Sequence, residues 1–155
     1  MQYDRKITIS AGSNRRAMTW QAQTMLISEL WARLQAPARG TETLAAYLNM
    51  KKAQQDDLKD VGGFMAGTLS GPRRKANNVT GRDVITLDLD NIPSGGTEDV
   101  LRRVEALGCG YCIYSTRKHS PAAPRLRVLL PTDRTMTADE YEPCARKMAE
   151  DIGLE

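Results

Sequence analysis

Apolar and polar residues alternate most clearly in the middle of the chain. Ile85, Leu87 and Leu89 alternate with polar neighbours over residues 83–90. A period of two places these three side chains on one face of a strand. Similar alternation, or short apolar runs between turn residues, predicts strands at residues 6–10, 63–69, 111–115 and 125–130.

Helical periodicity follows four residues that can cap a helix through a side-chain hydroxyl: Ser28, Thr41, Thr97 and Thr137. Glu140 stands three residues after Thr137, which predicts a capping box. Gly108 and Gly153 are expected to end the last two helices. The charged residues 56–60 are expected to form a connector.

These elements predict an α+β fold. From residue 61 onward the order is strand, strand, helix, strand, strand, helix. That order favours a mixed sheet with helices packed on one face, in a palm, RRM-like or ferredoxin-like arrangement. The length of 155 residues suits a single domain. We expect residues 1–60 to be its mainly helical N-terminal part and residues 61–155 its palm part.

Composition narrows the class of protein. No apolar run is long enough to span a bilayer, and the N-terminus has no signal-peptide pattern. Cys109 and Cys112 formally match C-x-x-C, but no second pair accompanies them. We therefore expect Cys109, Cys112 and Cys144 to be buried, reduced thiols in a cytoplasmic protein.

The net charge of +3 does not by itself indicate a nucleic-acid-binding protein. Basic residues nevertheless gather on both sides of the strand at 83–90, among them Arg73, Arg74 and Lys75 before it and Arg125 and Arg127 after it. Such clusters fit a polyphosphate ligand or, for Arg73 to Lys75, a nucleic-acid backbone. The plainer interpretation is a solvated basic surface.

Two carboxylates end the central strand. Asp88 and Asp90 are spaced i, i+2, so both point to the face opposite Ile85, Leu87 and Leu89. Two like charges on one face of a strand call for a cation, and oxygen ligands suit Mg²⁺ or Mn²⁺. The alternative is a solvated strand end before the turn at residues 91–96.

His119 is the only histidine, in a basic loop after the strand at 111–115. We expect that strand to neighbour the acidic strand through a right-handed crossover, which would place His119, Asp88 and Asp90 on one rim of the sheet. Arg125 and Arg127 alternate with apolar residues and share a face. They can neutralise a triphosphate, or they can belong to an edge strand protected by charge.

Several segments together resemble the primase-polymerase domain of phage and mobile-element replication proteins, the virulence-associated protein E group of the archaeo-eukaryotic primase superfamily. The resemblance covers the chain from about residue 6 onward and lies in residues 59–64, Arg74-Lys75, Asn78-Val79, Leu87 to Asp90, Tyr114 to His119 and Pro124 to Pro131.

The resemblance implies a palm-type fold in which Asp88 and Asp90 bind catalytic divalent metals and His119 contacts nucleotide phosphate. The nucleotide site would consist of His119, Ser115 of the Ser-x-x-x-His motif, Arg125 and Arg127. The implied activity is template-dependent nucleotidyl transfer, either primer synthesis or DNA polymerisation. Its partners would be nucleoside triphosphates, a single-stranded DNA template and a helicase domain or protein.

The chain departs from this family in lacking an obvious third acidic metal ligand. Asp133 and the Asp139-Glu140 pair are the candidates within it; otherwise we expect the chain to be a fragment, with the ligand beyond Glu155. Two other functions stay open at this point. One is a catalytically silent nucleic-acid-binding palm, and the other is a different D-x-D metal enzyme, such as a nuclease or sugar-nucleotide transferase.

Overall fold

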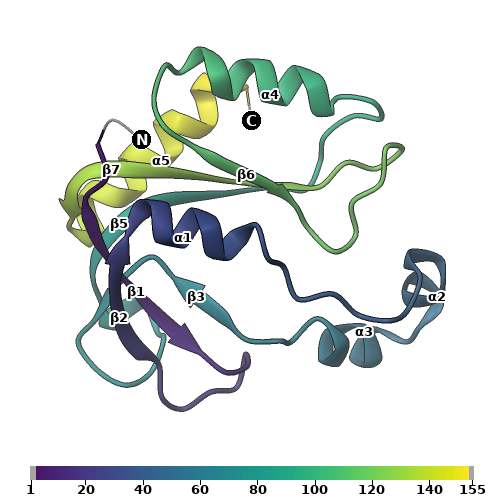
Figure 1. The fold of residues 1–155 in the computed structure, drawn as a ribbon, viewed down its shortest axis with the longest axis horizontal. Coiled ribbons are helices and arrows are strands. Elements are labelled where there is room, and N and C mark those ends of the chain that lie inside the picture. The colour runs from purple at the N-terminus through teal and green to yellow at the C-terminus, as the bar shows by residue number, and fades with distance from the viewer. Residues whose placement is uncertain (1–2, 154–155) are drawn as a thin grey trace. The chain divides into compact units, whose positions relative to one another are not determined.

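The computed structural model describes residues 3–153, and these form two compact units (Figure 1). The first unit extends to Asp83 and the second begins at Val84. The division expected from the sequence lay earlier, between residues 60 and 61. Residues 3–60 hold two strands besides three short helices.

The first unit is built on a three-stranded antiparallel sheet with the order β2-β1-β3. The strands are β1 (Lys6–Gly12), β2 (Gln21–Leu26) and β3 (Gly63–Met65). Ile7 and Ile9 of β1 are buried, as the alternation predicts. Strand β2 was not predicted, because its sequence Gln-Ala-Gln-Thr-Met-Leu lacks an apolar face and its side chains are mostly exposed.

Three helices follow: α1 (Ile27–Leu34), α2 (Leu44–Asn49) and α3 (Lys52–Leu58). The predicted caps were wrong for the first two. Ser28 lies inside α1, where it donates hydrogen bonds to Asp4, and the Glu29 carboxylate accepts one from the Leu26 amide at 2.7 Å. In α2 the capping hydroxyl belongs to Thr43 instead of Thr41.

Helix α3 also corrects an expectation, because it includes most of the acidic run predicted to be a connector. Asp56 and Asp57 lie on this helix, and Asp56 forms ion pairs with Lys52 and Lys59. Helical spacing of opposite charges stabilises such a polar helix. Charge density alone therefore misled the sequence interpretation.

The segment at residues 63–69 is two strands, and not the single strand predicted. Strand β4 (Gly67–Leu69) leaves the first sheet after Ala66 and pairs with the start of β5 (Val79–Leu89), which follows a short 3₁₀ turn at Ala76–Asn78. Gly67 permits this close approach, because a Cβ there would lie 2.0 Å from the Gly81 carbonyl oxygen.

Strand β5 begins with a buried carboxylate. The side chain of Asp83 is 3% exposed and accepts hydrogen bonds from the Arg5 guanidinium at 2.9 Å and the Thr8 amide at 2.8 Å. Asp83 is the last residue of the first unit, so this contact joins β5 to β1 within that unit.

The strand order of the second sheet corrects the predicted topology. The four-stranded sheet has the order β4-β5-β7-β6, with β6 at Cys112–Ser115 and β7 at Leu126–Met136. Strand β7 therefore separates the acidic strand from β6, and the two were wrongly expected to be neighbours. Adjacent strands are antiparallel, so the sheet is not mixed, and β5 and β6 run in the same direction on either side of β7.

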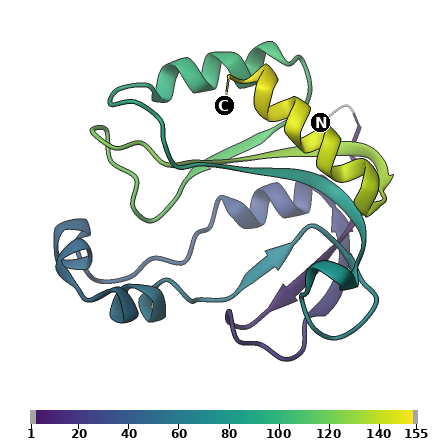
Figure 2. The same cartoon turned by 180° about the vertical axis from the view of Figure 1, so that it is seen from behind.

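Helices α4 (Thr97–Ala106) and α5 (Ala138–Asp151) pack on one face of this sheet, as expected (Figures 1 and 2). Val100 and Val104 of α4 join Ile85, Leu89 and apolar residues of β7 in a single core. The capping box of Thr137 and Glu140 is confirmed. Thr97 is the first residue of α4 and not its cap, because a turn closed by Gly96 begins the helix one residue earlier.

Gly108 and Gly153 have positive φ values of 66° and 74° just after α4 and α5, in agreement with the predicted helix ends. The three cysteines are free, as predicted. The prediction that they are buried was wrong for Cys109 and Cys144, which are exposed, and Cys112 is only partly buried. Burial raises the pKa of the Cys112 thiol. Among residues 3–153, no helix combines the length and apolar character needed to cross a membrane.

The Asp83 contact leads to a stability prediction. Arg5→Ala leaves a buried carboxylate without its cation and should lower the free energy of unfolding by about 3 kcal/mol. This value is at the lower end of the range for a broken buried ion pair, because Arg5 is partly exposed. Asp83→Asn in the same chain should restore part of the loss. Urea unfolding measures both, and exposed Lys6→Ala is the control. An Arg5→Ala variant as stable as the control would contradict this.

The α5 cap predicts a pH dependence. The hydrogen bond from Arg134, together with the Thr137 backbone, lowers the pKa of Glu140 to about 2 from its usual 4.5. A depressed carboxylate pKa stabilises the folded state above pH 4.5, and the contribution disappears as the pH falls through about 2. The wild type should therefore exceed Glu140→Gln in unfolding free energy near pH 6, and the difference should shrink toward pH 2. A constant difference would contradict the assignment.

Candidate phosphate and metal site

Two aspartates at the end of β5, Asp88 and Asp90, face two arginines at the start of β7, Arg127 and Arg125. Arg127 donates to Asp88 from Nε at 2.5 Å and from Nη2 at 3.0 Å, and Arg125 Nη1 lies 3.0 Å from Asp90 Oδ1. Moving two residues forward on β5 and two back on β7 gives the next pair, as expected for antiparallel neighbours. We call these four residues the charge ladder.

The ladder remains accessible to solvent. The Asp88 and Asp90 side chains are 54% and 56% exposed, and those of Arg127 and Arg125 are 39% and 36% exposed. The opposite face of β5 and β7 carries the apolar core with α4 and α5. The alternation seen in the sequence therefore directs the charges to the face without helices of the second unit.

Tyr114 extends the ladder onto a third strand. It lies directly opposite Arg127 in the β6–β7 register and forms a hydrogen bond with it. Burial lowers the pKa of Arg127, but the hydrogen bonds to Asp88 and Tyr114 outweigh it, so the pKa is raised and the guanidinium stays charged. Sequence reasoning missed Tyr114, because only the strand register places it on this face.

The structure does not bring Ser115 into the same group. Ser115 lies opposite Leu126, a residue of the buried core. Its side chain therefore points to the face of the sheet opposite the one that carries Asp88. Ser115 was predicted to bind nucleotide together with His119. In this geometry its neighbour Tyr114 occupies the position beside the arginines.

His119 lies in the hairpin that connects β6 to β7. Its Nδ1 accepts a hydrogen bond from the Arg125 amide at 3.1 Å. The neutral ring therefore carries its proton on Nε2, which can donate to a ligand. Further hydrogen bonds close the hairpin, from the Thr116 amide to Arg125 O and from the His119 amide to Thr116 O. Asp90, Arg125 and His119 are thus linked in one chain of contacts.

The candidates for a third acidic ligand lie elsewhere. Asp133 is six residues beyond Arg127 on β7, which is about 20 Å along a strand. Glu140 is engaged by Arg134 and by the Thr137 cap. Within residues 3–153, no group of three or more His, Cys, Asp or Glu side chains could hold a metal ion.

Asp88 and Asp90 nevertheless fit part of a magnesium or manganese site. They share a face, stand at a strand end and are exposed, and their present counter-ions are side chains that can move. Mg²⁺ is commonly held by one or two protein carboxylates, with its other ligands supplied by water and substrate phosphate. The pair could hold such an ion together with a nucleotide.

The remaining basic residues predicted to bind nucleic acid lie in the first unit. Arg73, Arg74 and Lys75 line a hollow of about 250 Å³. The other residues lining it come from the β1–β2 loop and are Arg15, Arg16, Ala17, Met18 and Trp20. Arg74 lies over the Trp20 indole, 5.3 Å from the ring centre.

The exposure of the ladder predicts that it contributes little to stability. Exposed ion pairs are worth about 0.2–1 kcal/mol. Asp88→Asn and Asp90→Asn should each lower the unfolding free energy by less than about 1 kcal/mol, as measured by urea denaturation. A loss above about 2 kcal/mol would mean that the ladder is a structural element of the fold, and it would remove the main reason to regard these residues as a ligand site.

The family model for the VapE N-terminal domain matches residues 1–155, the whole chain. Neither a curated protein nor a solved structure matches it significantly. The matched region includes the charge ladder, the His119 hairpin and the hollow at Trp20. The chain therefore belongs to the VapE N-terminal domain family.

Proposed function

We propose that this domain catalyses metal-dependent nucleotidyl transfer, as a DNA primase or polymerase, in the replication of a phage or other mobile element. The observation that carries the proposal is the charge ladder beside His119. Two carboxylates and two guanidiniums meet on one exposed sheet face, and the imidazole of the adjoining hairpin is hydrogen-bonded to the backbone of one of the arginines. These groups match the two halves of a metal–triphosphate ligand.

The topology of the second unit supports the same proposal. The order β5, α4, β6, β7, α5, with β7 between two strands of the same direction, is a split β-α-β unit. Both helices cover one face and leave the other for the ladder. This is the arrangement that a palm-type or RRM-like domain of the archaeo-eukaryotic primase superfamily would have.

The ladder can receive its ligand by exchanging partners. The Arg127 fork that now contacts both oxygens of Asp88 also matches two oxygens of a phosphate. When Arg125 and Arg127 turn to phosphate oxygens, Asp88 and Asp90 become available to a cation. Each charge keeps a partner throughout, so binding does not leave an isolated carboxylate on the sheet.

Each residue then has a defined task. Asp88 and Asp90 would hold Mg²⁺ or Mn²⁺. Such ions activate the attacking 3′-hydroxyl and stabilise the leaving pyrophosphate. His119 Nε2 would donate to the phosphates, and Arg125 and Arg127 would neutralise them. Tyr114 would orient Arg127 from the third strand. A single-stranded DNA template would be the second substrate, and a helicase domain or protein would be the partner in replication.

A second candidate function is a catalytically silent palm that binds nucleic acid. One observation favours it: no third carboxylate lies with Asp88 and Asp90 among the described residues. Two-metal catalysis needs enough anionic ligands to hold both ions. In a silent domain the arginines would contact a nucleic-acid backbone, while the aspartates would serve only as their counter-ions.

Nucleotide binding gives the first test. With Mn²⁺ and a nucleoside triphosphate, calorimetry should show binding that Arg127→Ala weakens by roughly ten- to a hundred-fold, the loss of one charge-assisted contact. Asp88→Asn with Asp90→Asn should abolish the manganese dependence. Arg102→Ala, an exposed arginine on α4, is the charge-matched control. If Arg127→Ala and the Asp88→Asn/Asp90→Asn double variant both bind the nucleotide with the affinity of the wild type, the nucleotide site lies elsewhere.

Nucleotide incorporation separates the two candidates. Wild type and the Asp88→Asn variant are compared on primed and unprimed single-stranded templates, with template hydrolysis measured in the same reactions. Metal-dependent extension that Asp88→Asn removes supports the transferase. Nucleic-acid binding without extension, and without metal-dependent nucleotide binding, supports the silent domain. Strand cleavage would indicate a nuclease.

A further inference from the structure

The hollow at Trp20 combines an aromatic ring with several basic side chains. In the β1–β2 loop, Trp20 is partly exposed, and its amide donates to Pro72 O at 2.6 Å. This bond ties the loop to the segment that carries Arg73, Arg74 and Lys75. The ring and the basic run are thus fixed side by side by backbone contacts, although they are more than fifty residues apart in the sequence.

Gly12 and Arg74 both lie against the indole ring. Gly12 lies against it so closely that a Cβ there would be 2.6 Å from Cε2 of Trp20. Arg74 is exposed and lies over the ring at 5.3 Å. A planar ligand can therefore replace the guanidinium over the ring, while the backbone at Gly12 keeps the indole in place.

The cations around the ring differ in their availability. Arg15 is held by Asp56, Asp57 and Asp60 of the first unit, so its charge is already balanced. Arg16, Arg73 and Lys75 are exposed, and none of them forms an ion pair with an acidic residue in the part of the chain that the structure describes. With Arg74, four basic side chains are free to contact an anion.

We infer that this hollow binds a single-stranded nucleic acid. One base stacks on Trp20 in the place of the Arg74 guanidinium, and Arg16, Arg73, Arg74 and Lys75 contact the flanking phosphates. Sequence-tolerant single-strand sites combine these two features, a cationic track and an aromatic stacking platform. At about 250 Å³ the hollow is smaller than most small-molecule pockets, which suits one base of a strand that runs across it.

This inference deepens the proposed function by assigning the contact with the template to the first unit. It rests on the proposed function only where it identifies the bound strand as a template. The binding itself needs neither Asp88 nor a metal. Quenching of Trp20 fluorescence by the strand in EDTA therefore tests the hollow, whereas manganese-dependent nucleotide binding tests the ladder. Either can fail while the other succeeds.

The experiment uses Trp31→Phe, which leaves Trp20 as the sole tryptophan of the chain. Titration with oligo(dT) in EDTA should quench Trp20 fluorescence. Adding Arg73→Ala and Lys75→Ala should weaken binding and reduce the slope of log affinity against log salt by about 1.4, or about 0.7 per lost phosphate contact. Trp20→Ala, followed by anisotropy of labelled oligo(dT), should weaken binding about 5- to 100-fold.

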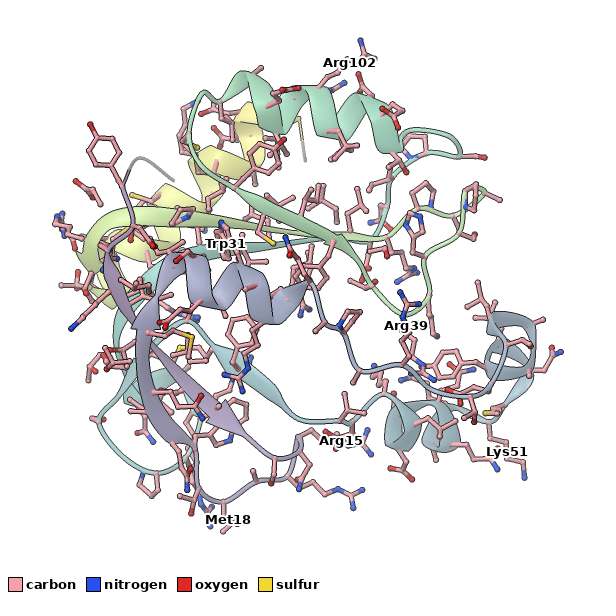
Figure 3. All side chains as sticks on the ribbon, in the orientation of Figure 1. Arg15, Met18, Trp31, Arg39, Lys51 and Arg102 are labelled. Atoms are coloured by element: carbon pink, nitrogen blue, oxygen red, sulfur yellow. The ribbon has the colours of Figure 1, made fainter. Side chains whose placement is uncertain are left out.

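The matched control is Arg39→Ala with Lys51→Ala, which removes one arginine and one lysine from exposed positions of the same unit (Figure 3). Figure 3 also labels Arg15 and Met18, which mark the loop beside the hollow. Unchanged Trp20 fluorescence, or equal losses in the control and the Arg73/Lys75 variant, would overturn the inference. So would equally tight binding to anionic phospholipid vesicles. The Arg73/Lys75 variant keeps the test valid if Trp20→Ala fails to fold.

Discussion

The buried carboxylate of Asp83 is the contact on which the placement of β5 depends. A charge removed from water costs several kcal/mol unless it is paired and hydrogen-bonded, and Arg5 with the Thr8 amide supplies those partners. Within the first unit, this contact fixes the side to which Asp83 points at the start of β5. In the second unit, Ile85 and Leu89 anchor the rest of the strand in the apolar core. Since side chains alternate, a slip by one residue would send Asp88 and Asp90 into that core.

The ladder itself is held weakly, and this suits a ligand site better than a structural one. Its ion pairs are about half exposed, so water and salt compete with them. The ion pair of Arg5 and Asp83 differs, because the Asp83 carboxylate is buried and breaking the pair would lower the free energy of unfolding much more. The segment from Asp83 to Asp90 thus carries one carboxylate that stabilises the fold, that of Asp83, and two carboxylates whose ion-pair partners can be exchanged, those of Asp88 and Asp90.

Much of the second unit could be predicted from local patterns. The strand at 83–90, the shared face of Asp88 and Asp90, the arginine strand and the Thr137 cap all follow from side-chain period and hydrogen-bonding capacity. What the sequence could not show depends on partners distant in the chain. Strand β2 has no apolar face, and β7 inserts between β5 and β6. Register also decides that Tyr114, and not the predicted Ser115, lies opposite Arg127. The hollow at Trp20 was missed in the same way, since Pro72 and Gly12 position the ring.

The hairpin that carries His119 has a consequence for selectivity. Because the imidazole is tied to the Arg125 backbone and the hairpin is closed by its own hydrogen bonds, the histidine and the arginine that follows it move as one body. The loop tip is also joined to the turn before α4, where the Gly95 amide donates to Pro121 O at 3.0 Å. A ligand that contacts the imidazole therefore meets a donor that is already positioned, so the protein loses little conformational entropy there on binding. Because the backbone of Arg125 is tied to the same ring, its guanidinium can reach only anion oxygens within one side-chain length of the imidazole. This limit would favour anions of matching size over anions of equal charge and different shape.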